Sequence, residues 1–189
     1  MHKEVLYKHF LDCLLFFKNV DVKQNAKIID VGTGAGFPGM VLKIARPDIE
    51  LTLMDGLNKR LTFLNAVLEA LNLEAKTIHM RAEDGGKNAD YREKYDIACA
   101  RAVANLPVLC EYCIPFVKMS GNFISYKSGE IEEEVNAAER AIKILGGQIK
   151  NVFKFDLLNQ KRSFVTIEKI KTTPKTYPRK VGTPSKEPL

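Results

Sequence analysis

Residues 28–39 read Ile-Ile-Asp-Val-Gly-Thr-Gly-Ala-Gly-Phe-Pro-Gly, and their pattern is the strongest indication of the fold. A short apolar run leads into glycines at alternate positions, Gly32, Gly34 and Gly36, and Pro38 then opens a helical pattern. Glycines in such a turn let the backbone take positive φ and let a ligand approach where a Cβ would collide. Proline suits the first turn of a helix, whose free N–H groups point towards that ligand. The stretch therefore predicts a strand, a glycine loop and a helix at the cofactor end of a doubly wound α/β domain.

Asp30 separates two classes of cofactor for this loop. Gly34, Gly36 and Gly39 alone satisfy the spacing G-x-G-x-x-G, so a dinucleotide such as NAD has to be considered. Dinucleotide folds, however, usually keep an apolar residue where Asp30 stands. The spacing D-x-G-x-G-x-G instead resembles the first motif of S-adenosylmethionine-dependent methyltransferases, in which the acidic residue supports the loop around the methionine moiety. We therefore expect S-adenosylmethionine as the cofactor, with an NAD-dependent oxidoreductase of the Rossmann type as the alternative.

The length and composition are those of a single globular domain, residues 1–189. The densest apolar run, residues 13–17, is far too short to span a membrane, and the N-terminus lacks a secretory signal pattern. Cys110 and Cys113 have C-x-x-C spacing, but they fall within a helical pattern and no second ligand pair accompanies them. We expect structural thiols, no metal site, a cytoplasmic location, no membrane partner and a monomer.

The positive charge is concentrated at the C-terminal end of the chain. The net charge is +6, and residues 147–189 hold ten Lys or Arg against three Asp or Glu. A basic C-terminal segment on a nearly neutral body predicts a polyanionic partner, with nucleic acid as the leading candidate. The alternative is a solvated basic surface without a partner.

Alternating strands and helices are predicted along the whole chain. The apolar periodicity predicts helices at residues 3–17, 38–45, 58–71, 105–116 and 130–145. It predicts strands at residues 28–31, 49–54, 75–80, 95–100, 121–127, 148–157 and 163–170. Within the second core helix we expect Asn58 as the cap and Leu61, Leu64, Val67 or Leu68, and Leu71 as the buried stripe.

This order gives a mostly parallel seven-stranded sheet with helices on both faces. The last two strands form a closing antiparallel hairpin through residues 158–162, which by resemblance is a feature of the Rossmann-like class I methyltransferase sheet. Residues 172–189 hold four of the eight prolines, and we expect an extended basic tail there.

Several short motifs resemble one family over nearly the whole chain. Besides Asp30 to Gly39 they are His9-Phe10-Leu11-Asp12, Asp55-Gly56-Leu57-Asn58-Lys59-Arg60, Arg81-Ala82-Glu83, Arg101-Ala102, Tyr126-Lys127-Ser128-Gly129, and the ending Tyr177-Pro178-Arg179-Lys180 with Gly182-Thr183-Pro184. The chain thereby resembles the ribosomal small-subunit guanine-N7 methyltransferases (methyltransferase G), also called glucose-inhibited division protein B. Two departures stand out: Cys13 replaces the usual serine, and family members usually carry several dozen helical residues before the position of His9. We interpret residues 1–20 as what remains of that N-terminal helical region.

The resemblance implies cofactor contacts at Gly32, Phe37, Ala82, Glu83 and Arg101, within a loop that also holds Gly34 and Asp30. Asp55 ends the second strand, where an acidic residue can accept hydrogen bonds from ribose hydroxyls. A helix-capping or loop carboxylate is the alternative for Asp55, and a core residue is the alternative for Phe37. Arg101 follows a buried strand and needs a partner, either the methionine carboxylate or an RNA phosphate.

The function implied by the resemblance is methyl transfer to N7 of a guanine in 16S ribosomal RNA, free or in a small-subunit assembly particle. We expect phosphate contacts from the basic residues Lys169, Lys171, Lys175, Arg179 and Lys180. The segment after the fourth strand, Arg101-Ala102-Val103-Ala104, lacks the Asn/Asp-Pro-Pro-aromatic motif of enzymes that methylate exocyclic amines. Since N7 carries a lone pair and no proton, we expect no catalytic general base. A non-enzymatic RNA-binding module is the second alternative.

Overall fold

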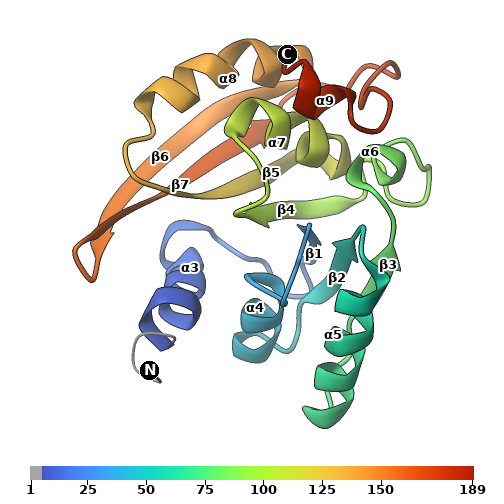
Figure 1. Cartoon of the computed structure of the whole chain (residues 1–189), viewed down its shortest axis with the longest axis vertical. Coiled ribbons are helices and arrows are strands. Elements are labelled where there is room, and N and C mark those ends of the chain that lie inside the picture. The colour runs from blue at the N-terminus through green and yellow to red at the C-terminus, as the bar shows by residue number, and fades with distance from the viewer. Residues whose placement is uncertain (1–5) are drawn as a thin grey trace.

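The computed structural model describes residues 6–189, which form a seven-stranded sheet in the order β3-β2-β1-β4-β5-β7-β6 (Figure 1). The strands are β1 (Lys27–Val31), β2 (Glu50–Asp55), β3 (Lys76–His79), β4 (Tyr95–Arg101), β5 (Val117–Ser128), β6 (Gly147–Leu157) and β7 (Gln160–Lys169). Strands β1 to β5 pair in parallel, and β7 is antiparallel to both β5 and β6. The predicted sheet and its closing hairpin are confirmed.

Helices cover both faces of the sheet, as predicted (Figure 1). They are η1 (Leu6–Leu11), α2 (Asp12–Leu14), α3 (Phe16–Asn19), α4 (Gly39–Ala45), α5 (Asn58–Ala70), α6 (Ala82–Gly85), α7 (Leu106–Cys113), η2 (Ile114–Phe116), α8 (Glu132–Ile144) and α9 (Thr183–Lys186). One core cluster packs α7 and α8 on the sheet, and the other packs α3, α4 and α5 on its opposite face. Adjacent residues of β1 show the alternation of a strand, because Ile28 belongs to one cluster and Ile29 to the other. No helix among residues 6–189 is long and apolar enough to cross a membrane.

The N-terminal helix predicted for residues 3–17 is instead a series of short helical segments. A π-helix over Leu6–Leu11 leads into α2 and α3, and residues 1–5 lie outside the described part of the chain. In α5, Leu57 is the cap instead of Asn58, and Leu71 is 48% exposed because the helix ends at Ala70. The stripe of Leu61, Leu64 and Leu68 is buried as predicted.

The closing hairpin is tighter than the predicted loop over residues 158–162. Strands β6 and β7 pair from Gly147 and Lys169 down to Leu157 and Gln160, so Leu158 and Asn159 alone form the turn. Both turn residues have positive φ, 52° and 58°, which is typical of the two-residue turns that follow the twist of a hairpin. Strand β6 ends at Leu157 as predicted, whereas β7 begins at Gln160, before the predicted start at Ser163.

The C-terminal segment packs on the body of the protein and is extended only in part. Residues 183–186 form α9, which lies beside α7 (Figure 1). Pro184 is buried, and a Cβ added to Gly86 at the end of α6 would lie 2.6 Å from Pro178 Cγ. The prediction of a wholly extended tail is wrong at α9, because the fixed φ of Pro184 suits the first turn of a helix.

Candidate active site

Two cavities open side by side at the carboxyl ends of the parallel strands. They lie near β1 and β4, the neighbouring strands between which the strand order of the sheet reverses. This is the place where open α/β sheets bind ligands. The first cavity, of about 550 Å³, is lined by the ends of β1, β2 and β3, by α6 and by the C-terminal segment. The second cavity, of about 480 Å³, is lined by α2, the ends of β4 and β5, and β7. Ala102, which directly follows β4, lines both.

The glycine loop brings the backbone to the first cavity. Gly32 has φ of +73°, and it and Thr33 donate hydrogen bonds to Met54 O of 2.9 and 3.0 Å. A Cβ on Gly32 would lie 2.9 Å from Cγ2 of Val103, which also lines this cavity. A glycine is therefore required here by both the backbone conformation and the space.

Asp30 supports the loop from inside the sheet. Its side chain is fully buried, and Oδ2 accepts hydrogen bonds from Thr33 Oγ1 (2.7 Å) and from the Gly39 N–H at the start of α4 (2.9 Å). Oδ1 has no hydrogen-bond partner among the described residues. Burial raises the pKa of Asp30 to about 6, against the opposing effect of the two hydrogen bonds. Asp30 does not itself line the first cavity, so it acts on the loop and not directly on a ligand.

Asp55 ties the glycine loop to the next strand. Its carboxylate, 3% exposed at the residue level, accepts hydrogen bonds of 2.9 Å from the N–H groups of Gly34 and Leu57. The Arg60 guanidinium lies 3.2 Å from Oδ2. The bond to Leu57, next to the start of α5, supports the alternative of a loop carboxylate. Asp55 also lines the first cavity.

Glu83 joins the opposite wall of the first cavity to the C-terminal segment. Ala82 and Glu83 both line this cavity at the start of α6. Glu83 Oε1 accepts a hydrogen bond of 3.0 Å from the backbone N–H of Gly182, which lines the same cavity. Of the eight predicted cofactor residues, Gly32, Asp55, Ala82 and Glu83 therefore line one cavity, while Asp30 and Gly34 hold the loop in place.

Phe37 and Arg101 lie at the N-terminal helices instead of the first cavity. The Phe37 ring contacts the rings of His9 and Phe10, with centroid distances of 5.5 and 5.3 Å, and the Arg101 guanidinium lies 5.5 Å from its centre. Arg101 Nη1 forms an ion pair of 3.1 Å with Asp12. Among the described residues its charged partner is Asp12, whose segment folds over the end of β4. A contact of Arg101 with the methionine carboxylate or with an RNA phosphate stays a prediction. The alternative of a packing role for Phe37 fits this placement.

The second cavity is lined by charged side chains of both signs: Arg101, Asp12, Lys127, Glu134 and Arg162. Of these five, Arg101 alone was predicted from the sequence as a site residue. Lys127 Nζ lies 2.5 Å from Glu134 Oε1, and Arg162 Nε lies 3.8 Å from Asp12 Oδ1. Burial raises the pKa of Asp12, and the two guanidinium groups beside it oppose that effect. Asp12 and Lys127 stood in quoted motifs, but no signal in the sequence singled out Arg162.

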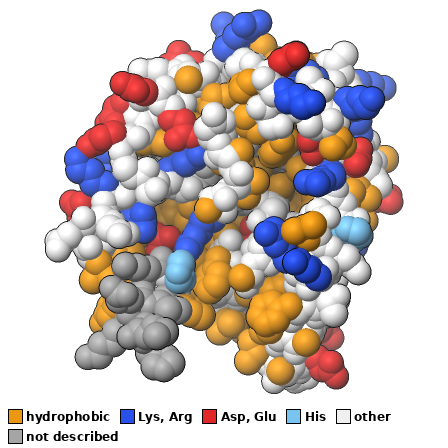
Figure 2. Space-filling view, in the orientation of Figure 1, with side chains coloured by type: hydrophobic (Ala, Val, Ile, Leu, Met, Phe, Trp, Pro, Cys, Tyr) orange, Lys and Arg blue, Asp and Glu red, His pale blue; other side chains and the backbone are white. Residues whose placement is uncertain are grey.

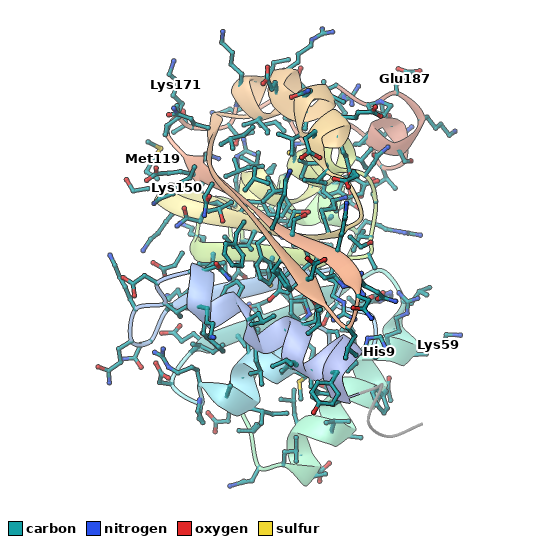
Figure 3. All side chains as sticks on the ribbon, turned by 90° about the vertical axis from the view of Figure 1, so that its left-hand side faces the viewer. His9, Lys59, Met119, Lys150, Lys171 and Glu187 are labelled. Atoms are coloured by element: carbon teal, nitrogen blue, oxygen red, sulfur yellow. The ribbon has the colours of Figure 1, made fainter. Side chains whose placement is uncertain are left out.

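The predicted phosphate contacts are dispersed in the structure. Lys169 is buried: its Nζ lies 3.1 Å from both Ile114 O and Glu93 Oε1 and also contacts Thr173 Oγ1, so it is not available to a phosphate in this structure. Arg179 forms an ion pair of 2.6 Å with the buried Glu111. Lys171 extends from the edge opposite to His9 (Figure 3). Lys175 and Lys180 are exposed.

Comparison with known proteins identifies the family. The sequence model of the GidB family, described as rRNA small subunit methyltransferase G, matches residues 1–165. The chain belongs to this family. It is 52% identical over 190 residues to the ribosomal RNA small subunit methyltransferase G of Desulforamulus reducens, covering 99% of this chain and 79% of that protein. It is 53% identical to the protein of the same name from Alkaliphilus oremlandii, covering 99% and 80%.

Solved structures show the same fold at low sequence identity. A methyltransferase from Pyrococcus furiosus superposes with a TM-score of 0.67 at 16% identity, covering 86% of this chain and 83% of that one. A SAM-dependent O-methyltransferase from Thermotoga maritima gives a TM-score of 0.64 at 14% identity, covering 87% and 66%. The predicted class I fold and family are confirmed. The chain is a methyltransferase whose cofactor is S-adenosylmethionine, which retires the NAD-dependent alternative.

The first cavity fits this cofactor. Its volume lies within the range of small-molecule sites, about 300–1,000 Å³. A Cβ at Gly32 would approach Val103 and narrow the cavity. Two buried carboxylates among its lining residues, Asp55 and Glu83, can accept hydrogen bonds from ribose hydroxyls and from an adenine amino group.

Proposed function

We propose that this chain transfers a methyl group from S-adenosylmethionine to N7 of a guanine in 16S ribosomal RNA, with the cofactor in the first cavity and the guanine in the second. The observation that carries the proposal is that Ala102 lines both cavities. Two ligands held on either side of this short segment can meet across it. The names of the relatives, ribosomal RNA small subunit methyltransferase G, support the RNA as the substrate.

In this proposal the first cavity fixes the cofactor through backbone and carboxylate groups. Gly32 allows the methionine portion to approach the loop, Asp55 accepts from the ribose, and Glu83 accepts from the adenine. Bound there, the cofactor supplies an electrophilic methyl group. The chain's task is to orient it and to keep the loop rigid, which Asp30 does through its hydrogen bonds to Thr33 and Gly39.

The second cavity suits a base with an attached phosphate. Arg101, Lys127 and Arg162 line it, and each can donate to a guanine carbonyl or to a phosphate oxygen. Each is also held beside a carboxylate of Asp12 or Glu134, which fixes its position before the RNA arrives. Binding of an RNA phosphate would then not have to order a free side chain, and this lowers the entropic cost of association.

The residues around this cavity provide positioning and not proton transfer. N7 of guanine has an in-plane lone pair and no proton to lose. The two carboxylates of the cavity are engaged in ion pairs, and Nδ1 of the nearby His9 lies 2.5 Å from Arg101 Nη2, which donates to it. Holding N7 in line with the methyl group can alone supply several kcal/mol of catalysis.

The face that presents His9 also presents the basic surface expected for an RNA-binding protein. Figure 2 shows Lys and Arg side chains at the centre of this face and towards its upper right, where Figure 1 places the C-terminal segment. Figure 3 shows that Lys59 extends towards the same side of the molecule as His9. We propose this face as the RNA-binding surface, with Lys59, Lys175 and Lys180 among its phosphate contacts and with Lys169, Lys171 and Arg179 left out.

The test is transfer of labelled methyl from S-adenosylmethionine to small-subunit RNA that lacks the modification, supplied as naked RNA and as a ribosomal subunit. We expect one substrate to be labelled to near one methyl group per molecule. Double replacement of Lys127 and Arg162 by methionine should abolish labelling while S-adenosylhomocysteine still binds. Failure to label either substrate by a chain that binds S-adenosylhomocysteine would favour the RNA-binding module without catalysis.

A further inference from the structure

The C-terminal segment, residues 172–189, is held against the body of the protein by charged side chains, of which Glu111 is buried and Arg92, Glu93 and Arg179 are half-buried. The Arg92 guanidinium donates hydrogen bonds to four carbonyl oxygens: those of Gly86, Thr173, Pro174 and Tyr177. Three of these belong to the segment, so Arg92 fixes its path. Glu93 adds a hydrogen bond of 2.8 Å from the Thr173 N–H.

A second anchor lies closer to the first cavity. Arg179 donates to both carboxylate oxygens of Glu111 on α7, and its own backbone N–H donates to Oε1 at 2.7 Å. Glu111 is 1% exposed, so its charge depends on Arg179 for compensation. Arg179 also donates a hydrogen bond of 2.7 Å to Glu187 O, and this closes residues 179–187 into a short loop.

That loop is one wall of the first cavity. Val181, Gly182 and Ser185 line the cavity together with Glu83 and Tyr112. The Gly182 N–H donates to Glu83 Oε1, and this leaves Oε2 available to a ligand. The helix α9 within this loop lies close to α6 and α7 in Figure 1.

We propose that the C-terminal segment is a positioning element of the cofactor site. Arg179, through Glu111, places Gly182 so that its N–H fixes the Glu83 carboxylate and its backbone closes the cavity over the adenine. The proposal rests on the assignment of the first cavity to S-adenosylmethionine. It gives a role in cofactor binding to a basic segment that the charge pattern alone had assigned to RNA.

The test compares two arginines that each pair with a carboxylate. Arg179→Gln releases the segment without changing a residue that lines the cavity, and the control Arg46→Gln breaks the pair with Asp48 in the turn between α4 and β2. We expect Arg179→Gln to weaken S-adenosylhomocysteine binding at least tenfold, to raise KM for S-adenosylmethionine, and to change kcat at saturation less than threefold. Arg179→Lys should restore part of the affinity, and Arg46→Gln should bind as the unmodified chain does.

A second pair of variants decides the matter if Arg179→Gln does not fold. Gly182 and Gly129 have φ of +83° and +79°, and a Cβ on either meets nothing within 4 Å, so alanine imposes the same backbone strain at both. Gly182→Ala should weaken S-adenosylhomocysteine binding, and Gly129→Ala should not.

The inosine analogue of S-adenosylhomocysteine adds a readout of Glu83. The unmodified chain should prefer the adenine form because the analogue lacks the amino donor, and Arg179→Gln should reduce that preference. Folded Arg179→Gln or Gly182→Ala with unchanged affinity for S-adenosylhomocysteine overturns the proposal. If the unmodified chain does not bind S-adenosylhomocysteine, the assignment of the cavity itself fails, which is a different result.

Discussion

Nη1 of Arg101 lies 3.1 Å from Oδ2 of Asp12, so the end of β4 is joined to the N-terminal helical segment by an ion pair that is mostly shielded from solvent. The Asp12 side chain is 7% exposed and also lies beside Arg162. One carboxylate thus stands between two guanidinium groups contributed by distant parts of the chain.

Replacing Asp12 by asparagine should therefore destabilise the fold and impair RNA methylation. The two guanidinium groups lose their shared counter-charge and hydrogen-bond acceptor, which should cost about 1.5–3 kcal/mol because both groups keep partial access to solvent. The control is Glu50→Gln, whose pair with Lys27 is exposed on both sides and should contribute no more than about 1 kcal/mol. Urea unfolding measures both, and equal losses in the two variants would contradict the account.

Gly32→Ala should weaken S-adenosylhomocysteine binding at least tenfold. Its Cβ would lie 2.9 Å from Val103, which also lines the first cavity, so the added methyl displaces a wall of the site. Gly129→Ala is the control again, with similar φ and open space around its Cβ. Calorimetric titration gives both dissociation constants, and an unchanged constant for Gly32→Ala removes Gly32 from the site.

Asp30 should make cofactor affinity fall in acid. Its pKa is raised to about 6 by burial, so the charged form that accepts from Thr33 and Gly39 is lost as pH falls through that value. S-adenosylhomocysteine binding should weaken between about pH 7 and 5, and Asp30→Asn should remove this dependence. An equally steep profile in Asp30→Asn would assign the effect to another group.

The raised pKa of Asp30 should have the opposite effect on the stability of the fold, which should increase in acid. A carboxyl whose pKa is higher in the folded chain than in the unfolded chain binds its proton more readily when folded. Relative to Asp30→Asn, the unmodified chain should gain on the order of 2 kcal/mol of unfolding free energy as pH falls from about 7 towards 4. If the unfolding free energies of the two proteins change with pH in the same way, burial does not raise the pKa of Asp30.

Lys169→Met should leave the salt dependence of RNA binding unchanged, because the ammonium lies inside the protein beside Glu93. Lys180→Gln, on the exposed surface, should lower the salt slope by about one unit if it contacts a phosphate. Fluorescence titration at several salt concentrations distinguishes the two. A reduced slope in Lys169→Met would mean that the C-terminal segment opens when RNA binds.

The fold could be predicted from local patterns because each pattern has a local cause. The residue types at positions 28–39 alone indicate a strand, a glycine turn and a helix. Alternating apolar residues indicate the strands. The turn at Leu158 and Asn159 could not be placed in this way, since a leucine with positive φ is determined by the pairing of long strands on either side.

Site residues could be predicted only where they end a strand or follow one closely. Gly32, Asp55, Ala82 and Glu83 each follow or end a strand, so the topology of the sheet brings them together. The partners of Arg101, Lys169 and Arg179 come from segments far away in the chain, and the net charge of a segment does not tell whether its cations face solvent or a buried carboxylate. Arg179 illustrates this, because the structure turns an expected RNA contact into an anchor on Glu111.

Methyl transfer to guanine N7 between two cavities that share Ala102 can be tested with RNA that lacks this nitrogen. Small-subunit transcripts containing 7-deazaguanosine in place of guanosine keep the Watson–Crick edge but have a C–H where N7 would be. We expect the protein to bind both RNAs with similar affinity and to label only the guanosine transcript. Methyl transfer to the 7-deazaguanosine transcript at a comparable rate would contradict this expectation.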